Sequence, residues 1–413
     1  MKIKLVREST LAFTIILGGA AAAYLVLLSS FPAGDFQTYY AAAENAVSGS
    51  QFIGADAPMP HGSYVYLPIT LLFFIPFSLL PQWTVAYPLL IGLNVAGGII
   101  LGHLVILILK ERGVTLSNLN IALVVGCFTV SSVGVLNLLQ TQPNLWLAVF
   151  VVAGFRFVQQ DRPLMAGILF AIPAIVKLWP ALLGVWLLYR HEWRAIAVAV
   201  ATGVSAIIAS VLVFGVDVNV RFFNHILAER SWTDNFAGGV DPDMQIVTIR
   251  RPISMLLPSL DPAFMAIIGL LICGVLLVTF YWLGTVGDID PFLPFSATLV
   301  LMTIAFPSIT PYAVFFLVPG VIYLYQIDTP AYIYSLSIST IMIALTFTPK
   351  HINSIISLLP LPRIVSTGIN QLIRTVLQYG SIPLWGALIL LAMLGVISLR
   401  RTSTETEWRE NSV

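Results

Sequence analysis

The sequence predicts an all-α protein, built as a polytopic bundle of membrane-spanning helices. Of its 413 residues, 58% are hydrophobic and only 9% are charged, whereas about 25% of the residues in ordinary soluble domains are charged. Long stretches without an acidic or basic residue recur along the chain, and a helix needs about 20 apolar residues to cross the hydrocarbon core. We therefore expect about twelve spans in a single domain over residues 1–401, followed by a polar tail over residues 402–413.

The composition also excludes several classes of function, including soluble enzymes and disordered proteins. Twenty basic and nineteen acidic residues give a formal net charge of +1, so we expect no nucleic acid as a partner. The two cysteines, Cys127 and Cys273, lie in apolar runs, and no two of the five histidines have the spacing of metal ligands. We therefore expect no cofactor. The candidate residues do not require a metal, and they do not exclude a divalent ion.

Basic residues set the expected orientation, because they prefer the cytoplasmic side of a membrane. The region from Phe31 to Leu67 contains no Lys or Arg, so we place it outside the cell. Five basic clusters are placed inside, together with both termini, in a multi-pass protein of the cell membrane. These clusters are Lys2/Lys4/Arg7, Lys110/Arg112, Arg156/Arg162, Arg190/Arg194 and Arg400/Arg401.

The predicted spans follow from this arrangement. The first is interpreted as an anchor, because its apolar run is too long for the h-region of a signal peptide. Two spans, residues 163–176 and 178–189, are too short to cross, so one end of each must lie in a wet cavity lined by protein. The full set is residues 9–30, 83–109, 118–138, 145–158, 163–176, 178–189, 195–216, 262–286, 291–306, 311–326, 330–348 and 381–399.

Three segments then lie outside the cell. The first, residues 31–82, ends in an apolar stretch from Tyr66 to Leu80 that is interrupted by prolines, which predicts juxtamembrane helices along the membrane. The second, residues 217–261, is the most charged part of the chain. The third, residues 349–380, is either external or re-entrant.

Asp35 is the candidate catalytic base. It follows the first span, and no other acidic residue lies between Glu8 and Glu44. A partly buried carboxylate can take a proton from a hydroxyl, while the aromatic face of Tyr39, one turn later, could hold a sugar ring. The alternative is that Asp35 only caps the helix that follows it.

Lys177 is the candidate ligand of a phosphate. It lies between the two short spans and is followed by Trp179 and Pro180, and an ionisable residue at depth beside a helix break indicates a functional site. The alternative is a lysine whose amine reaches the membrane surface along its aliphatic stem.

Four other residues are candidates for binding a sugar or an acceptor. Tyr64 and Tyr66 precede Pro68, and Gln142 and Asn144 flank Pro143. Carboxamides can hydrogen-bond the hydroxyls of a sugar. The alternatives are an interfacial belt of aromatic residues for the tyrosines and a simple turn for the amides.

Arg250 and Arg251 end the large external segment and enter a helical stretch. Paired arginines at such a point could clamp a phosphate, or they could anchor the chain to anionic lipid. All these candidates map to the same side of the membrane. Together with the lack of a Gly-rich nucleotide loop, this favours transfer of a sugar from a lipid phosphate outside the cell.

With these residues in place, the chain resembles glycosyltransferase family 87 of the GT-C superfamily over roughly residues 10–320. The motifs that carry the resemblance are short, and their order and spacing make it specific. They are Gly34-Asp35-Phe36 with Tyr39, Tyr64-Val-Tyr66-Leu-Pro68 with Pro76, Gln142-Pro-Asn144, Ala166-Gly167, Lys177-Leu-Trp-Pro180 and the basic loop Arg190–Arg194.

The resemblance implies a GT-C bundle and an inverting transfer from a polyprenyl or dolichyl phosphate sugar, most often mannose. Asp35 would be the base and Lys177 would lie near the lipid phosphate. The chain departs from the family pattern at Leu67, at Thr141 and at Phe306–Tyr312, where a late external segment containing a histidine is replaced. The last departure concerns the acceptor subsite.

A glycolipid or glycan hydroxyl would be the acceptor, and membrane lipids would surround the protein. Two other functions remain open from the residues alone. A glycolipid transporter or flippase would use the same cations near mid-membrane, although no inverted repeat is visible. A polymerase or ligase of lipid-linked glycans would centre its activity on the segment 217–261.

Overall fold

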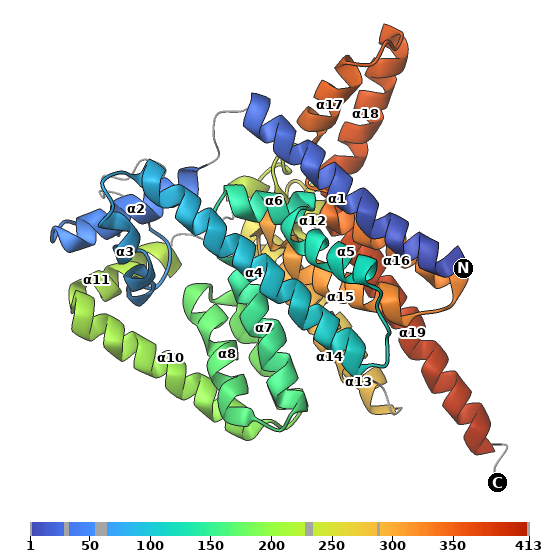
Figure 1. The fold of residues 1–413 in the computed structure, drawn as a ribbon, viewed down its shortest axis with the longest axis horizontal. Helices are drawn as coiled ribbons and strands as arrows, with labels where there is room; N and C mark the ends of the chain where they lie inside the picture. Colours follow the sequence, from blue (N-terminus) through green and yellow to red (C-terminus); the bar gives the residue numbers. More distant parts are fainter. Residues whose placement is uncertain (1, 29–32, 54–63, 228–233, 287–289, 411–413) are drawn as a thin grey trace.

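The computed structural model describes residues 2–28, 33–53, 64–227, 234–286 and 290–410, and most of them form helices (Figure 1). The all-α class is confirmed. The only strands among the described residues are β1 (Ile246–Val247) and β2 (Ser308–Ile309), which pair antiparallel. The helices are α1 (Lys2–Leu28), α2 (Gly34–Val47), η1 (Pro68–Phe73), α3 (Ile75–Ser78), α4 (Trp83–Glu111), α5 (Asn118–Thr129), α6 (Ser132–Leu139), α7 (Asn144–Gln159), α8 (Pro163–Val176), η2 (Trp179–Leu182), α9 (Leu183–Tyr189), α10 (Trp193–Phe214), α11 (Val216–Arg221), η3 (Phe222–Leu227), η4 (Asp234–Phe236), α12 (Arg250–Leu256), α13 (Pro262–Val286), α14 (Phe292–Ala305), η5 (Thr310–Ala313), α15 (Val314–Gln326), α16 (Pro330–Ala344), α17 (Pro349–Ser357), α18 (Arg363–Tyr379) and α19 (Ile382–Glu410).

Several helices have the length and composition of membrane spans. Among the described residues, α4, α10, α13 and the Ile382–Arg400 part of α19 pass this test individually, and two bent pairs, α5 with α6 and α16 with α17, pass it together. Five shorter apolar helices occupy other predicted spans: Asn144–Gln159, Pro163–Val176, Trp179–Tyr189, Phe292–Ala305 and Thr310–Gln326. A membrane protein is therefore indicated. About twelve spans stays a prediction, because it requires the five shorter helices and also α1 to cross the membrane.

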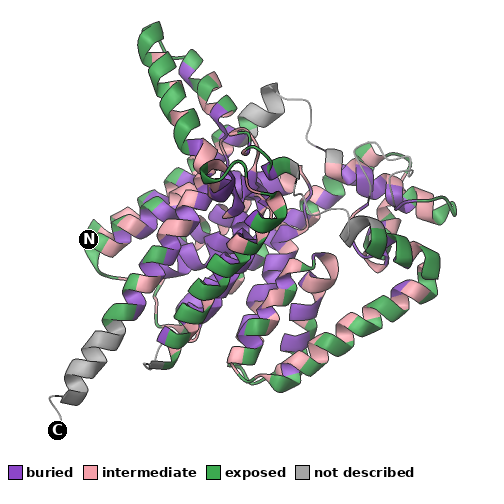
Figure 2. Cartoon of the chain, turned by 180° about the vertical axis from the view of Figure 1, so that it is seen from behind, coloured by how far each residue is buried: buried purple, intermediate pink, exposed green. Residues whose placement is uncertain are grey.

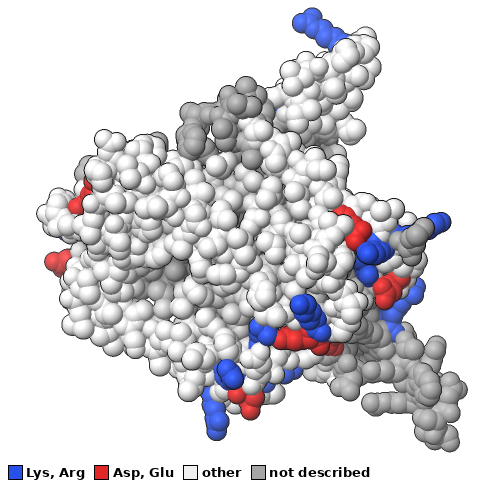
Figure 3. Space-filling model, in the orientation of Figure 1, with Lys and Arg blue, Asp and Glu red and all other residues white. Residues whose placement is uncertain are grey.

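Charge is distributed as such a protein requires. On the face shown in Figure 3, uncharged side chains cover most of the surface, and the charged ones gather mainly toward the end of the bundle that carries both termini. The helix α10 has exposed apolar side chains along its length (Figure 2). Because water would disfavour such a surface, this helix fits a lipid environment.

Three hydrophobic cores form among the described residues, and the two largest hold most of the chain together. The larger core fills the bundle of long helices. The smaller one belongs to the first predicted external segment, where α2, η1 and α3 pack against the beginning of α4 around Phe36, Tyr39 and Tyr64. The apolar stretch after Tyr66 forms two short helices, η1 and α3. Pro68 is the first residue of η1 and Pro76 the second residue of α3, positions in the first turn where proline is tolerated.

The third predicted external segment forms a helical hairpin, α17 and α18, which projects from the bundle (Figure 1). A bend of 93° separates α16 from α17. The predicted polar tail begins within α19, which runs on to Glu410; residues 411–413 lie outside the described part.

The short helix α8 spans Pro163–Val176, as the sequence predicts, which gives a length of about 21 Å. It ends because Lys177 adopts an extended backbone (φ −137°, ψ 119°) and η2 begins two residues later with Trp179-Pro180. Its partner is α10, and the two approach closely at Gly167, where a Cβ atom would lie 2.5 Å from the Ala195 carbonyl oxygen. This contact sets the separation of the two helices near the start of α8.

The close approach can be tested with Gly167→Ala. The added methyl group must push α8 away from α10, because the nearest atom is backbone; such overpacking typically costs about 1–3 kcal/mol. We expect a lower melting temperature of the purified protein in detergent. Gly203→Ala in α10 is the matched control, since a Cβ there meets nothing within 4 Å. Equal melting temperatures for the two variants would contradict the proposed packing.

Candidate active site

A chain of hydrogen-bonded side chains joins Asp35 to Lys177. Gln142 donates from Nε2 to an Asp35 carboxylate oxygen, and its Oε1 accepts from Lys177 Nζ at 3.2 Å. The three residues come from α2, from the turn before α7 and from the break after α8. One carboxamide therefore lies between an acidic and a basic group that are 142 positions apart in the sequence.

The Lys177 amine is buried, with 7% of the residue exposed, so the side chain does not reach the membrane surface. Besides Gln142, it donates to Asn144 Oδ1 at 2.9 Å and to the Tyr312 hydroxyl at 2.7 Å. An ammonium group has three N–H donors, and each has an acceptor here. The amine also lies 4.0 Å from the centre of the Tyr312 ring, a position that favours a cation.

A second row of contacts holds these acceptors in place. Asn144 donates to Asn137 Oδ1 at 2.9 Å, and Asn137 donates to the Pro311 carbonyl at 2.9 Å. Trp179 stacks on the Tyr312 ring with centroids 5.6 Å apart. The site is thus built where α6, α7, the break after α8 and η5 meet.

Asp35 lies in the first turn of α2, and it is not the capping residue: Ala33 holds that position and makes no side-chain cap bond. The Asp35 side chain is half-buried. Its neighbours on α2 face the smaller core, in which Tyr39 and Tyr66 share a hydrogen bond of 2.9 Å between their hydroxyls. The carboxylate is therefore placed between that tyrosine cluster and Gln142.

The predicted tyrosines are buried rather than arranged as an interfacial belt. Tyr64 bonds to the Thr70 hydroxyl at 2.7 Å and packs edge-on against Tyr66. Burial raises the pKa of Tyr39 and of Tyr66 well above the usual 10, and the nearby Asp35 carboxylate raises both further. Both phenols therefore stay protonated and can act as hydrogen-bond donors at neutral pH.

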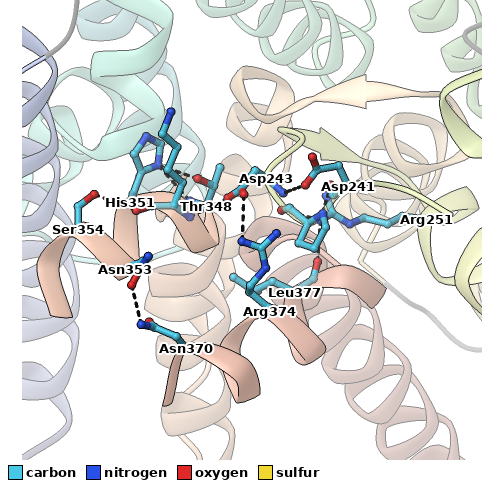
Figure 4. Close-up of polar contacts among 12 residues, drawn as sticks. Asp241, Asp243, Arg251, Thr348, His351, Asn353, Ser354, Asn370, Arg374 and Leu377 are labelled. Carbon is cyan, nitrogen blue, oxygen red and sulfur yellow. Dashed lines mark hydrogen bonds and ion pairs between the residues drawn. The ribbon is translucent and has the colours of Figure 1, made fainter. Parts of the chain in front are cut away.

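Arg251 has partners other than a phosphate. It is fully buried, and its guanidinium donates to backbone carbonyls on both sides of it (Figure 4). The acceptors are Asp241, Pro242, Met244, Ile246, Leu377 and Gln378. The prediction of a helix start at Arg250 is confirmed, and Arg251 fastens the segment before that helix to the end of α18.

Arg250 is also buried, but its Nε has no hydrogen-bond partner in the described structure. No contact joins either arginine to Lys177 within the described residues.

Of the nine predicted site residues, the structure therefore brings seven together: Asp35, Tyr39, Tyr64, Tyr66, Gln142, Asn144 and Lys177.

Two functional candidates were missed in the sequence, Tyr312 and Asn137. Tyr312 and Tyr66 each lie within two residues of a proline at the start of a helical stretch: Tyr312 follows Pro311, and Tyr66 precedes Pro68. Asn137 interrupts an apolar run, and a polar residue at such a position has to find a partner inside the protein. Both signals were present, but neither says which residue is the partner. The described residues contain no group of three His, Cys, Asp or Glu side chains that could hold a metal ion.

The arrangement suits a reaction in which one group loses a proton and another develops negative charge. A carboxylate that is half-buried can accept a proton, and a buried ammonium can stabilise negative charge that develops nearby. The neutral amide between them keeps the two groups from forming a direct ion pair.

The sequence model of glycosyltransferase family 87 matches residues 64–311, which is more than half of the chain. The matched region contains Tyr64, Gln142, Asn144 and Lys177. It ends one residue before Tyr312. Asp35 and the hairpin α17–α18 also lie outside it. A comparison with curated proteins found no match.

The supporting position of Arg251 can be tested with Arg251→Lys. Lysine has fewer donors in a different geometry, so several buried carbonyls lose their partner, which costs about 3 kcal/mol. We expect faster thermal unfolding in detergent. Arg374→Lys is the control: its half-exposed side chain makes one ion pair of 3.6 Å with Asp243, and surface pairs contribute at most about 1 kcal/mol. An equal loss of thermal stability in both variants would show that Arg251 does not hold these two segments together.

Proposed function

The chain belongs to glycosyltransferase family 87, and from this premise we propose that it transfers a sugar from a polyprenyl or dolichyl phosphate to a hydroxyl of a glycolipid or glycan. Mannose is the first sugar to test. The transfer takes place on the extracytoplasmic side of the cell membrane, with both termini in the cytoplasm and the helices forming a GT-C bundle. The configuration at the anomeric carbon is inverted.

The observation that carries the proposal is the amide bridge from Asp35 to Lys177. In the reaction, Asp35 accepts the proton of the acceptor hydroxyl while that oxygen attacks the anomeric carbon. The bond from this carbon to the phosphate oxygen breaks, and the phosphate leaves with the electron pair. Lys177 lowers the cost of that negative charge. A single displacement of this kind needs one base, and Asp35 is the only carboxylate in the described hydrogen-bond network around Lys177.

The tyrosines would bind the sugar, whereas the carboxamide oxygens of Gln142 and Asn144, predicted as sugar ligands, accept hydrogen bonds from Lys177. Tyr39 and Tyr66 lie close enough to the Asp35 carboxylate for its charge to act on both phenols, and Tyr64 packs against both of their rings. We assign the sugar ring to this tyrosine cluster, while Gln142 and Asn144 hold the cation in place. Arg250 remains a candidate for the donor phosphate, because its buried Nε lacks a protein acceptor among the described residues. Arg251 is not carried forward in this role, since backbone carbonyls occupy its donors.

The base is tested with Asp35→Asn in an assay that supplies polyprenyl-phosphate mannose and a membrane lipid fraction as acceptor. The amide keeps the size of the side chain but cannot accept the proton, so we expect transfer to fall by about 10²–10⁴-fold. Glu44→Gln on the same helix α2 is the matched control, because Glu44 is exposed. Undiminished transfer by Asp35→Asn would exclude the carboxylate from the mechanism. Movement of the donor across the bilayer without a labelled product would identify a flippase instead.

The cation is tested by comparing Lys177→Met with Lys177→Arg. Methionine has a similar length but no charge, so we expect kcat to fall by about 10²–10³-fold, whereas arginine restores part of the rate because the charge is kept. The measurement is the initial rate of sugar transfer at saturating donor, with correct folding checked by size-exclusion chromatography. If Lys177→Met raised only the KM for the donor, Lys177 would bind substrate without stabilising the transition state.

A further inference from the structure

The hairpin of α17 and α18 has a surface that the proposed reaction does not use. It projects away from the bundle, and exposed residues occur along both of its helices (Figure 2). The connection between the helices includes Leu358, which is 83% exposed, and the second residue of α18, Ile364, is 87% exposed. The hairpin comes after the region that the family model matches.

Exposed apolar residues on α18 form one stripe. Val365, Ile369, Leu372 and Val376 follow one another at intervals of four, three and four residues, so they lie on the same face of the helix. Each is between 37% and 65% exposed. A hairpin surrounded by water would turn such a stripe inward.

Polar residues of the hairpin face its own partner helix and the base of the bundle instead. Asn370 bonds to Asn353 across the hairpin, and Arg374 pairs with Asp243 at 3.6 Å (Figure 4). The Lys350 backbone N–H donates to the same carboxylate at 2.7 Å. These contacts fix the orientation of the hairpin and leave the apolar stripe on the outside.

The charges of this region are all of one sign. Between Thr329 and Leu399 the sequence contains Lys350, Arg363 and Arg374 but no Asp or Glu. Arg363 is exposed at the start of α18, next to the apolar residues of the tip. Exposed basic residues beside an apolar stripe are typical of helices that lie on anionic membranes.

The bend between α16 and α17 gives the direction of the hairpin. The helix α16 packs along α19, one of the helices long enough to cross a membrane. Because α17 departs from α16 at 93°, it runs nearly parallel to the membrane plane if α16 runs across it. The end of α18 is joined to the bundle by the hydrogen bond from Arg251 to the Leu377 carbonyl. Arg251 follows β1, which pairs with β2, and β2 leads directly to Tyr312, a partner of Lys177. The hairpin therefore lies on the same side of the bundle as the candidate active site.

We propose that the α17–α18 hairpin is an interfacial anchor that lies on the leaflet facing the active site. The stripe Val365, Ile369, Leu372 and Val376 enters the edge of the hydrocarbon, together with Leu358 and Ile364 at the tip. Arg363 contacts the phosphates of anionic head groups. The partner is thus a lipid surface, and this inference does not depend on the identity of the sugar or of its carrier.

The test compares Leu372→Cys with Gln371→Cys, one residue apart and on opposite sides of the polar boundary. Each full-length variant is labelled with a nitroxide and reconstituted into vesicles of phosphatidylcholine with phosphatidylglycerol. Cys127 and Cys273 are buried, and labelling of the unmodified protein measures their background. We expect at least a threefold higher ratio of oxygen to nickel-chelate accessibility at position 372 than at 371, because oxygen concentrates in hydrocarbon and the chelate in water.

Two results would overturn the proposal. Equal ratios at both positions, with the nickel chelate reaching each, would place the stripe in water. Exclusion of both reagents at position 372 would show that protein, from a second copy or another chain, covers the stripe. As a second measurement, Arg363→Gln should lower the ratio at position 372 in vesicles with phosphatidylglycerol and leave it unchanged in pure phosphatidylcholine; an identical response in both would remove the anionic head group from the proposal.

Discussion

The burial of one ammonium group organises the candidate active site. A charge placed in a low-dielectric interior is costly unless every donor is satisfied, and Lys177 meets this requirement with acceptors from Gln142, Asn144 and Tyr312. Gln142 and Asn144 flank Pro143 at the start of α7, and Tyr312 belongs to η5. The amine can therefore be satisfied only when the break after α8, the start of α7 and η5 have come together. The same interaction that stabilises the charge therefore assembles the site.

Much of this arrangement could be predicted from the sequence where the signal is local. The bounds of α8 follow from its apolar run and from the Lys-Leu-Trp-Pro break, and Asp35 stands out as a lone acid between distant neighbours. Partners were harder to predict, because they depend on which helices become neighbours. Nothing near Arg251 in the sequence indicates that Leu377, 126 positions away, accepts from its guanidinium. The sequence suggested either a phosphate clamp or an anchor to anionic lipid.

Helix lengths limited the prediction in a second way. Hydrophobic runs locate the helices, since α4, α8 and α13 lie almost where the apolar stretches predicted them. The runs do not say whether a helix of ten to seventeen residues crosses the membrane or ends inside it. The prolines of the Tyr66–Leu80 stretch were likewise visible, and their effect, two short helices packed on a separate small core, depended on the aromatic residues of α2.

The shortness of α8 has a consequence for the depth of the site. With a length of about 21 Å against a hydrocarbon thickness of about 30 Å, a helix that starts at the inner boundary stops several ångströms before the outer one. In the proposed orientation, Lys177 would then lie below the level of the surrounding head groups. A carrier phosphate held beside it would not have to rise out of its leaflet, and the approaching hydroxyl would have to descend to meet it.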